Sequence, residues 1–241
     1  MKSLIAVAAV FVLAAAAAIV FVLSPHTETG PDAFAGAYPL VTAAPTGVPA
    51  LTWRPTGTPA GPLPVFRGPG SRVTGRTVNQ KVGLSYARFG PPWKTTARRT
   101  GDPTSGQGID GKVKDYKHFW YASVSIEPLD PKLSVPGTQR LRAAAELTGA
   151  AFIKNLYRDD GARKDLAGAA MTVGRHSAWV TAFRMTHTTD TDRVQKSQTE
   201  VVVAVDTGRT LPAIVEITIP GNQNHLLPDI GHVVRSLRVV R

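Results

Sequence analysis

The feature that most constrains this chain is the stretch from Leu4 to Leu23, which contains no polar side chain. About 20 apolar residues at a rise of 1.5 Å per residue span roughly 30 Å, the thickness of the hydrocarbon core of a bilayer. A helix also satisfies its own backbone hydrogen bonds there. Residues 1–23 are therefore predicted to form one N-terminal transmembrane helix, an anchor for the remainder of the chain.

A secretory signal peptide is the alternative interpretation of the same stretch. The alanines from Ala14 to Ala18 offer small-residue cleavage sites, but the apolar run continues from Ile19 to Leu23. Because a signal peptide has an apolar core of only about 7–15 residues, an uncleaved anchor fits the length better. Cleavage would give a secreted protein instead.

The charges around the apolar run predict its orientation. Lys2 precedes it, and no Lys or Arg follows it until Arg54. Since cytoplasmic flanks carry the excess of positive charge, we expect the N-terminus in the cytoplasm and the C-terminal domain outside the cell membrane.

The second segment, residues 24–72, is rich in proline, glycine, alanine and threonine. Proline removes backbone donors and favours the extended polyproline II conformation. At about 3 Å per residue such a linker reaches up to roughly 100 Å or more. We expect an extracytoplasmic spacer here, with the folded domain at residues 73–241.

The charge and the cysteine content narrow the classes of function. The chain has 28 Lys and Arg against 17 Asp and Glu, a formal charge of +11, and no cysteine. The missing cysteine excludes disulfides, thiolate metal sites and a lipoprotein anchor.

A basic surface outside the membrane suits an acidic envelope polymer, anionic lipid or an acidic protein, and nucleic acid is not expected. A requirement for solubility, or a gene whose base composition favours arginine codons, would also account for the charge.

Alternating apolar and polar residues predict a series of strands in the domain. These expected strands are Thr77–Val82, Leu84–Phe89, Phe119–Glu127, Leu166–Val173, Ser177–His187, Thr199–Asp206 and Ala213–Ile219. The continuous apolar centre of Thr199–Asp206 is typical of a strand covered on both faces. Short turn-like connections predict that the last four strands pair as antiparallel hairpins.

Two stretches have the spacing of amphipathic helices. One runs from Thr138 to Tyr157, and the other follows Pro220-Gly221 and includes Leu226, Ile230 and Leu237. Since neither helix joins two parallel strands, the fold class is α+β, an antiparallel meander sheet flanked by helices.

This order of elements resembles the PsbP-like family, whose fold is an α/β/α sandwich. The family includes the photosystem II extrinsic protein, a Ran-binding import factor and LpqN-type actinobacterial lipoproteins. The resemblance is carried by the GPPW stretch at Gly90–Trp93, the VVVAVD strand at Val201–Asp206 and the closing VVRSLRVV stretch at Val233–Val240. It implies binding or scaffolding and not catalysis, although a fold alone does not fix a function. This chain differs from the lipoproteins in having a predicted transmembrane helix in place of a lipidated cysteine. Its alanine-rich and arginine-rich composition suits an actinobacterial source.

The segment from Lys94 to Lys117 is the densest cationic part of the sequence, and its glycines predict a loop. Its basic residues are the candidate contacts for an acidic partner. They are Lys94, Arg98, Arg99, Lys112, Lys114 and Lys117.

No catalytic or cofactor motif stands out in this sequence. His176 and Ser177 are neighbours in a strand and point to opposite faces, and there is no G-x-S-x-G elbow. The groups His187, Asp190, Asp192 and His225, Asp229, His232 contain ligand-type side chains, but a solvated polar face accounts for both. We expect no cofactor, no metal and no enzymatic activity.

Two hypotheses follow for the function. The first is a membrane-tethered binding or scaffold module of the cell envelope that contacts an acidic partner through its basic surface. The second is a small-molecule carrier or weak enzyme with a pocket between the sheet and the helix at Thr138–Tyr157.

Overall fold

The computed structural model describes residues 53–55, 60–96, 106–109, 122–156, 161–186 and 197–241. The strands are β1 (Val73–Asn79), β2 (Leu84–Phe89), β3 (Lys94–Thr96), β4 (Gly106–Gly108), β5 (Ser123–Pro128), β6 (Ala162–Val173), β7 (His176–Thr186), β8 (Ser197–Val205), β9 (Ala213–Pro220) and β10 (Arg238–Val239). The helices are α2 (Arg140–Leu156) and α3 (Leu227–Ser236), with short 3-10 helices η2 (Pro131–Leu133) and η3 (Gly221–Leu226).

The strands form two sheets. The main sheet has the order β3-β4-β5-β9-β8-β7-β6, and the small sheet has the order β1-β2-β10. Neighbouring strands pair antiparallel in both sheets. The fold class is therefore α+β, as the sequence predicts.

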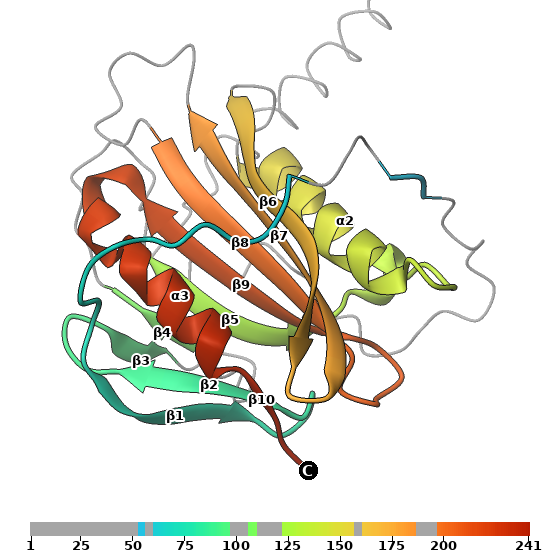
Figure 1. The fold of residues 1–241 in the computed structure, drawn as a ribbon, viewed down its shortest axis with the longest axis horizontal. Coiled ribbons are helices and arrows are strands. Elements are labelled where there is room, and N and C mark those ends of the chain that lie inside the picture. Colours follow the sequence, from blue (N-terminus) through green and yellow to red (C-terminus); the bar gives the residue numbers. More distant parts are fainter. Residues whose placement is uncertain (1–52, 56–59, 97–105, 110–121, 157–160, 187–196) are drawn as a thin grey trace, which may run out of the picture.

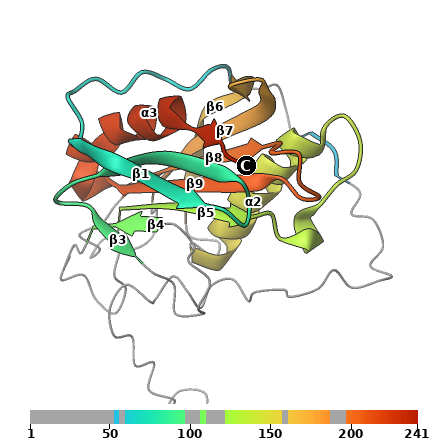
Figure 2. The same cartoon turned by 90° about the horizontal axis from the view of Figure 1, so that it is seen from below.

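The main sheet is covered on both sides (Figure 1, Figure 2). Helix α2 lies on one side, while α3 and the small sheet lie on the other. Strand β8 shows why the sheet needs both covers, since Val201, Val203 and Val205 belong to the core under α3, and Val202 and Ala204 to the core under α2. Successive side chains of a strand point to opposite faces, so a continuous apolar strand is buried twice.

The small sheet is fixed to the main sheet by polar contacts as well as by its core residues. The Asn79 side-chain amide donates to the carbonyl of Ile126 on β5 at 2.9 Å. The Gln107 side chain of β4 accepts from the Phe89 N–H at 2.8 Å and donates to the Phe89 carbonyl at 2.9 Å. Both side chains are buried, so these bonds satisfy groups that would otherwise lose water without compensation.

Most of the expected elements are confirmed. Strand β2 has the expected bounds, and the hairpins β6-β7, β7-β8 and β8-β9 are antiparallel. The expected strand Thr77–Val82 is displaced, because β1 runs over Val73–Asn79 and residues 80–83 form the turn to β2. The helix α2 begins at Arg140, two residues after the expected start at Thr138. The closing stretch ends as a helix at Ser236 and continues as β10, which pairs with β2.

The prediction of a loop from Lys94 to Lys117 is wrong at two places. Lys94–Thr96 forms β3 and Gly106–Gly108 forms β4, and the two strands pair with each other. Three residues are too few to show an alternating pattern, and the glycines on either side of Gln107 suggest a loop. The tertiary bonds of the Gln107 side chain hold this strand at the sheet instead.

The packed part of the chain begins before Val73. Residues 60–72, which we call the strap, run across the α3 side of the main sheet before β1 (Figure 1). Gly61 forms a β-bridge with Gly168 of β6, and the side chains of Leu63 and Phe66 pack against the core. This packing was not predicted from the proline-rich sequence.

The predicted transmembrane segment, Leu4 to Leu23, lies outside the described residues. Within the described ranges, no helix is both long and apolar enough to cross a membrane.

Candidate functional site

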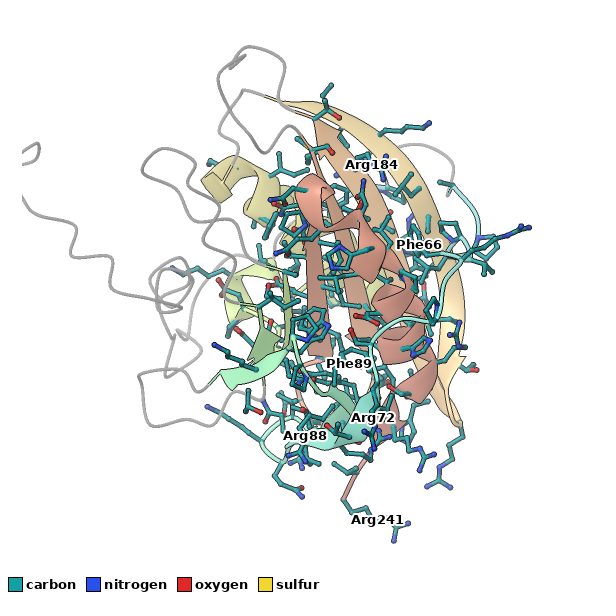
Figure 3. All side chains as sticks on the ribbon, turned by 90° about the vertical axis from the view of Figure 1, so that its left-hand side faces the viewer. Phe66, Arg72, Arg88, Phe89, Arg184 and Arg241 are labelled. Atoms are coloured by element: carbon teal, nitrogen blue, oxygen red, sulfur yellow. The ribbon has the colours of Figure 1, made fainter. Side chains whose placement is uncertain are left out.

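The strap, the small sheet and α3 form a strongly basic surface, which we call the basic layer. Its members are Arg67, Arg72, Arg76, Lys81, Arg88, Arg209, Arg235, Arg238 and Arg241. All of them are exposed except Arg76, which is half-buried. Figure 3 shows Arg72, Arg88 and Arg241 around the small sheet, far from Arg184 at the other end of the molecule.

Strand pairing brings these cations together from distant parts of the sequence. The guanidinium of Arg76 donates to the Ser85 hydroxyl at 2.8 Å and to the Ser236 carbonyl at 2.7 Å, so it bridges β1, β2 and the end of α3. Burial and the positive charge of the nearby Arg238 lower the pKa of Arg76. Arg209, from the β8-β9 connection, joins the layer by donating to the Gln80 carbonyl at 3.0 Å.

Carboxylates are almost absent from this surface. Residues 60–96 contain no Asp or Glu, and residues 221–241 contain only Asp229, which is completely buried. Within the described residues, no carboxylate forms an ion pair with Arg72, Arg88 or Arg238. The positive charges of Arg72, Arg88 and Arg238 are therefore not neutralised by an ion pair within the described residues.

The single carboxyl group of the layer holds the strap in place. Asp229, in the first turn of α3, accepts hydrogen bonds from the backbone N–H and the hydroxyl of Ser71 and from the indole N–H of Trp93. The last two bonds measure 2.7 and 2.8 Å. Three converging donors satisfy the buried carboxyl group and join the end of the strap to α3 and to the turn after β2.

The exposed apolar side chains lie in the same layer. Among the described residues, the exposed large hydrophobic side chains are Val65 on the strap and Val73 and Val78 on β1, with exposed fractions of 82%, 49% and 40%. Strand β1 is an edge strand of the small sheet.

The contact residues predicted from the sequence are only partly described. Lys94 is exposed on β3, at the edge of the main sheet. Arg98, Arg99, Lys112, Lys114 and Lys117 lie outside the described residues, and their role as contacts stays a prediction. The sequence reasoning searched for a dense run of cations and missed the basic layer, whose signal is the absence of acidic residues from 60–96.

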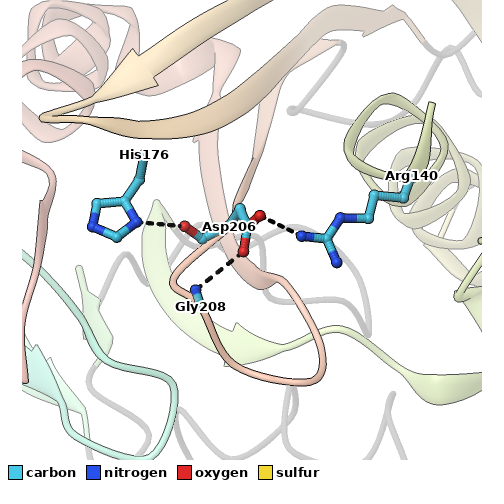
Figure 4. A network of polar contacts seen from close by, with 4 residues as sticks. All are labelled: Arg140, His176, Asp206 and Gly208. Atoms are coloured by element: carbon cyan, nitrogen blue, oxygen red, sulfur yellow. Dashed lines mark hydrogen bonds and ion pairs between the residues drawn. The ribbon is translucent and has the colours of Figure 1, made fainter. Parts of the chain in front are cut away.

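The α2 side of the molecule has a different arrangement, in which cations lie against carboxylates. Arg140 is paired with Asp206, Arg142 with Glu146 at 2.7 Å, and Arg163 with Asp165 at 2.7 Å. Figure 4 shows that Asp206 also accepts from the Gly208 N–H at 3.1 Å and, through its carbonyl oxygen, contacts His176 Nδ1 at 2.9 Å. The contacts of Asp206 with Arg140 and His176 join α2 to the ends of β7 and β8.

A buried carboxyl group also lies on the α2 side of the sheet. Glu200 of β8 is paired in register with Phe183 of β7, which packs with Phe152 of α2. Its oxygens accept from the Thr218 hydroxyl at 2.7 and 2.9 Å and from the Gln198 amide. Burial raises the pKa of Glu200 well above its ordinary value, and the bonds from Thr218 and Gln198 oppose this shift.

Polar atoms on this side that have no partner within the described part of the chain include the Gln198 side-chain carbonyl and the Thr148 hydroxyl on α2. Both residues are buried. Such groups carry a desolvation cost unless a proton donor or a ligand reaches them. Gln198, Glu200 and Thr218, which we call the polar cluster, are thus a second candidate site.

The possible metal ligands do not form a site in the described residues. No group of three or more His, Asp and Glu side chains is placed to hold a metal ion there. The Asp229 oxygens are already bonded to Ser71 and Trp93. His187, Asp190 and Asp192 lie outside the described residues.

Comparisons with known proteins give similarities among solved structures. No family model and no curated protein sequence matches the chain. Among solved structures, the chain is similar to the solution structure of the cyanobacterial PsbP protein, CyanoP, from Synechocystis sp. PCC 6803, with 15% sequence identity and a TM-score of 0.43. The similarity covers 74% of this chain and 99% of that one. The α+β class of this chain follows from the strands and helices described above.

Proposed function

We propose that this protein is a membrane-tethered binding module of the cell envelope, without catalytic activity, whose basic layer binds an acidic partner. The observation that supports it is the charge of the layer, nine basic residues around one completely buried carboxyl group. The apolar run at Leu4 to Leu23 supports the tether and the location outside the membrane.

Keeping these cations on one rigid surface costs stability in the free domain. Arg76 and Arg238 lie close enough for the charge of one to lower the pKa of the other. An acidic partner removes this repulsion, and the field of the whole layer attracts it over about a Debye length. Binding is therefore expected to weaken steeply as salt is added.

The proposal is tested on the full chain in nanodiscs of neutral phosphatidylcholine, with fluorescent polyglutamate as the acidic probe. The triple variant Arg72→Gln, Arg88→Gln, Arg238→Gln removes three charges from the basic layer. The matched control, Lys132→Gln, Lys154→Gln, Lys164→Gln, removes three exposed charges from η2, α2 and β6. We expect the first variant to lose most of the binding and the control to keep it.

Two outcomes would contradict the proposal. Equal losses in the two variants would show that net charge, and not the basic layer, determines binding. Loss only on neutralising Arg98, Arg99, Lys112, Lys114 and Lys117 would move the contact to the segment predicted from the sequence.

A small-molecule carrier or weak enzyme is the second candidate function. The polar cluster supports it, because the Gln198 carbonyl and the Thr148 hydroxyl are buried without a partner in the described part of the chain. A thermal-shift screen of lipids, sugars and metabolites on the full chain tests this function. A compound that stabilises the protein, but not its Glu200→Gln variant, would support the carrier, and a screen without any shift would count against it.

A further inference from the structure

We infer that the acidic partner of the basic layer is the surface of an anionic lipid bilayer, and that the β1 edge of the small sheet lies on the lipid headgroups. This inference rests on the proposed function and names the partner of the same surface. An acidic polypeptide is the alternative partner that the experiment below separates from it.

The first argument is the combination of charge and apolar exposure on β1. Val73 and Val78 are 49% and 40% exposed. Arg72 directly precedes β1, Arg76 lies on β1, and Arg88 lies on the neighbouring strand β2. An acidic polypeptide in water would pair with the arginines, but it would offer no apolar surface for the valines to contact. A bilayer surface offers phosphates to the arginines and the upper acyl region to the valines.

The second argument is the predominance of arginine. Eight of the nine cations of the basic layer are Arg and one is Lys. The planar guanidinium binds phosphate oxygens through two parallel N–H bonds and is less strongly hydrated than an ammonium group. This chemistry fits a surface of phosphodiester headgroups.

The third argument is that the surface is built on a fixed framework. Arg76 is held by Ser85 and Ser236, and Arg209 by the carbonyl of Gln80, beside the turn between β1 and β2. Since the backbone is already ordered by strand pairing, little conformational entropy is lost when the cations meet a flat array of headgroups.

The fourth argument is the predicted tether. A membrane anchor at Leu4 to Leu23 followed by a proline-rich segment keeps the domain within roughly 100 Å of the bilayer. The tether raises the effective concentration of the domain at the bilayer surface. Contacts that would be too weak to hold a free protein there are then strong enough for docking. The strap is the last part of this segment, and β1 follows it directly in the chain.

The absence of cysteine makes a direct test simple. A single Val78→Cys substitution takes an environment-sensitive fluorophore at β1, and Ala150→Cys takes it on the exposed face of α2 as the matched control. The full chain is reconstituted into vesicles of phosphatidylcholine alone or of equal parts phosphatidylcholine and phosphatidylglycerol, with and without a lipid-borne nitroxide quencher.

We expect the fluorophore at position 78 to be quenched several-fold more strongly in the anionic vesicles than in the neutral ones. The fluorophore at position 150 should be quenched equally in both. At about 0.5 M salt the Debye length falls to about 4 Å, and the quenching at position 78 should largely disappear. The triple variant Arg72→Gln, Arg88→Gln, Arg238→Gln should abolish it, while Lys132→Gln, Lys154→Gln, Lys164→Gln should keep it.

Other outcomes overturn the inference in distinguishable ways. If the label at position 78 responds to polyglutamate added to neutral vesicles but not to phosphatidylglycerol, the basic layer binds an acidic polypeptide, and only the lipid inference fails. If it responds to neither, the proposed function fails as well. Equal quenching at positions 78 and 150 would mean a non-specific approach of the whole domain and would also overturn the inference.

Discussion

On the α2 side of the main sheet, Arg140, Arg142 and Arg163 each lie against a carboxylate, whereas Arg72 and Arg88 on the opposite side have no such partner within the described residues. Each side also buries one carboxyl group. Asp229 is bonded to donors of the strap and of Trp93, and Glu200 is bonded to its neighbours within the sheet. The comparison indicates that the arginines on the α2 side stabilise the fold through carboxylate pairs, while Arg72 and Arg88 of the basic layer stay available to a partner.

The largest expected effect is on the stability of the basic layer. Asp229→Ala leaves the Ser71 N–H and the Ser71 hydroxyl without their acceptor, and leaves the Trp93 indole only its longer bond to the Ser71 hydroxyl oxygen at 3.1 Å. Because each unsatisfied buried donor costs about 1–3 kcal/mol, we expect a loss on the order of 3–5 kcal/mol in the free energy of unfolding, measured by urea denaturation.

The control for this variant is Asp165→Ala, which removes an exposed partner of Arg163 and should cost less than about 1 kcal/mol. Equal losses in the two variants would mean that water replaces the buried acceptor, and that Asp229 does not hold the strap.

The second prediction concerns the buried carboxyl group on the α2 side. Burial raises the pKa of Glu200 above its ordinary value of 4.5, so the folded state holds this proton more tightly than the unfolded state. As pH rises above 4.5 the unfolded state loses the proton first, and the wild-type protein loses stability until the pKa in the folded state is passed. Glu200→Gln does not titrate and should become the more stable of the two as pH rises.

Urea unfolding of both proteins from about pH 4 to about pH 9 measures this difference. Asp165→Asn, at an exposed pair, is the control and should not show the same trend. A difference between Glu200→Gln and wild type that is constant over this range would contradict the raised pKa.

The third prediction compares neighbours on the strap. The Phe66 side chain packs against the core and Val65 is 82% exposed. Phe66→Ala should lower the free energy of unfolding by about 1–2 kcal/mol, less than a fully buried aromatic would cost, and Val65→Ala by less than about 0.5 kcal/mol. Equal effects would show that the strap does not stabilise the fold.

The smallest expected effect is within the basic layer itself. Arg238→Gln removes a positive charge that lowers the pKa of Arg76, so we expect a gain of about 0.2–0.5 kcal/mol at low salt. The gain should vanish at high salt, where the repulsion is screened. A loss of stability at both salt concentrations would mean that the Arg238 side chain contributes packing and not repulsion.

The elements that could be predicted from the sequence are those with a regular period. Strands β7, β8 and β9 show it in their alternating or continuous apolar residues, and α2 and α3 in apolar positions three or four apart. The strap has no period. Only the isolated Phe66 indicates that the strap packs against the domain. The residues that the strap contacts through Gly61 and Ser71, which are Gly168 and Asp229, are far away in the sequence.

The absence of acidic residues from 60–96 is the sequence signal for part of the basic layer, but the place of Arg238 in it depends on strand pairing. Arg76 and Arg238 are far apart in the sequence, and only the contact of β10 with β2 brings them together. A run of cations such as Lys94 to Lys117 is conspicuous in a sequence, whereas cations spread over two ends of a chain are not. The polar cluster had a clearer signal, since Glu200 directly precedes the continuous apolar centre of β8.

Arginine footprinting tests the role of the basic layer most directly, because it reads the side chains themselves. The full chain in neutral nanodiscs is treated with a dicarbonyl reagent specific for arginine, with and without polyglutamate, and the modified positions are measured by mass spectrometry. We expect several-fold protection at Arg72, Arg88, Arg235 and Arg238, and unchanged modification at Arg163, Arg175 and Arg184. Equal protection of both groups, or protection confined to Arg98 and Arg99, would contradict the assignment of the partner surface to the basic layer.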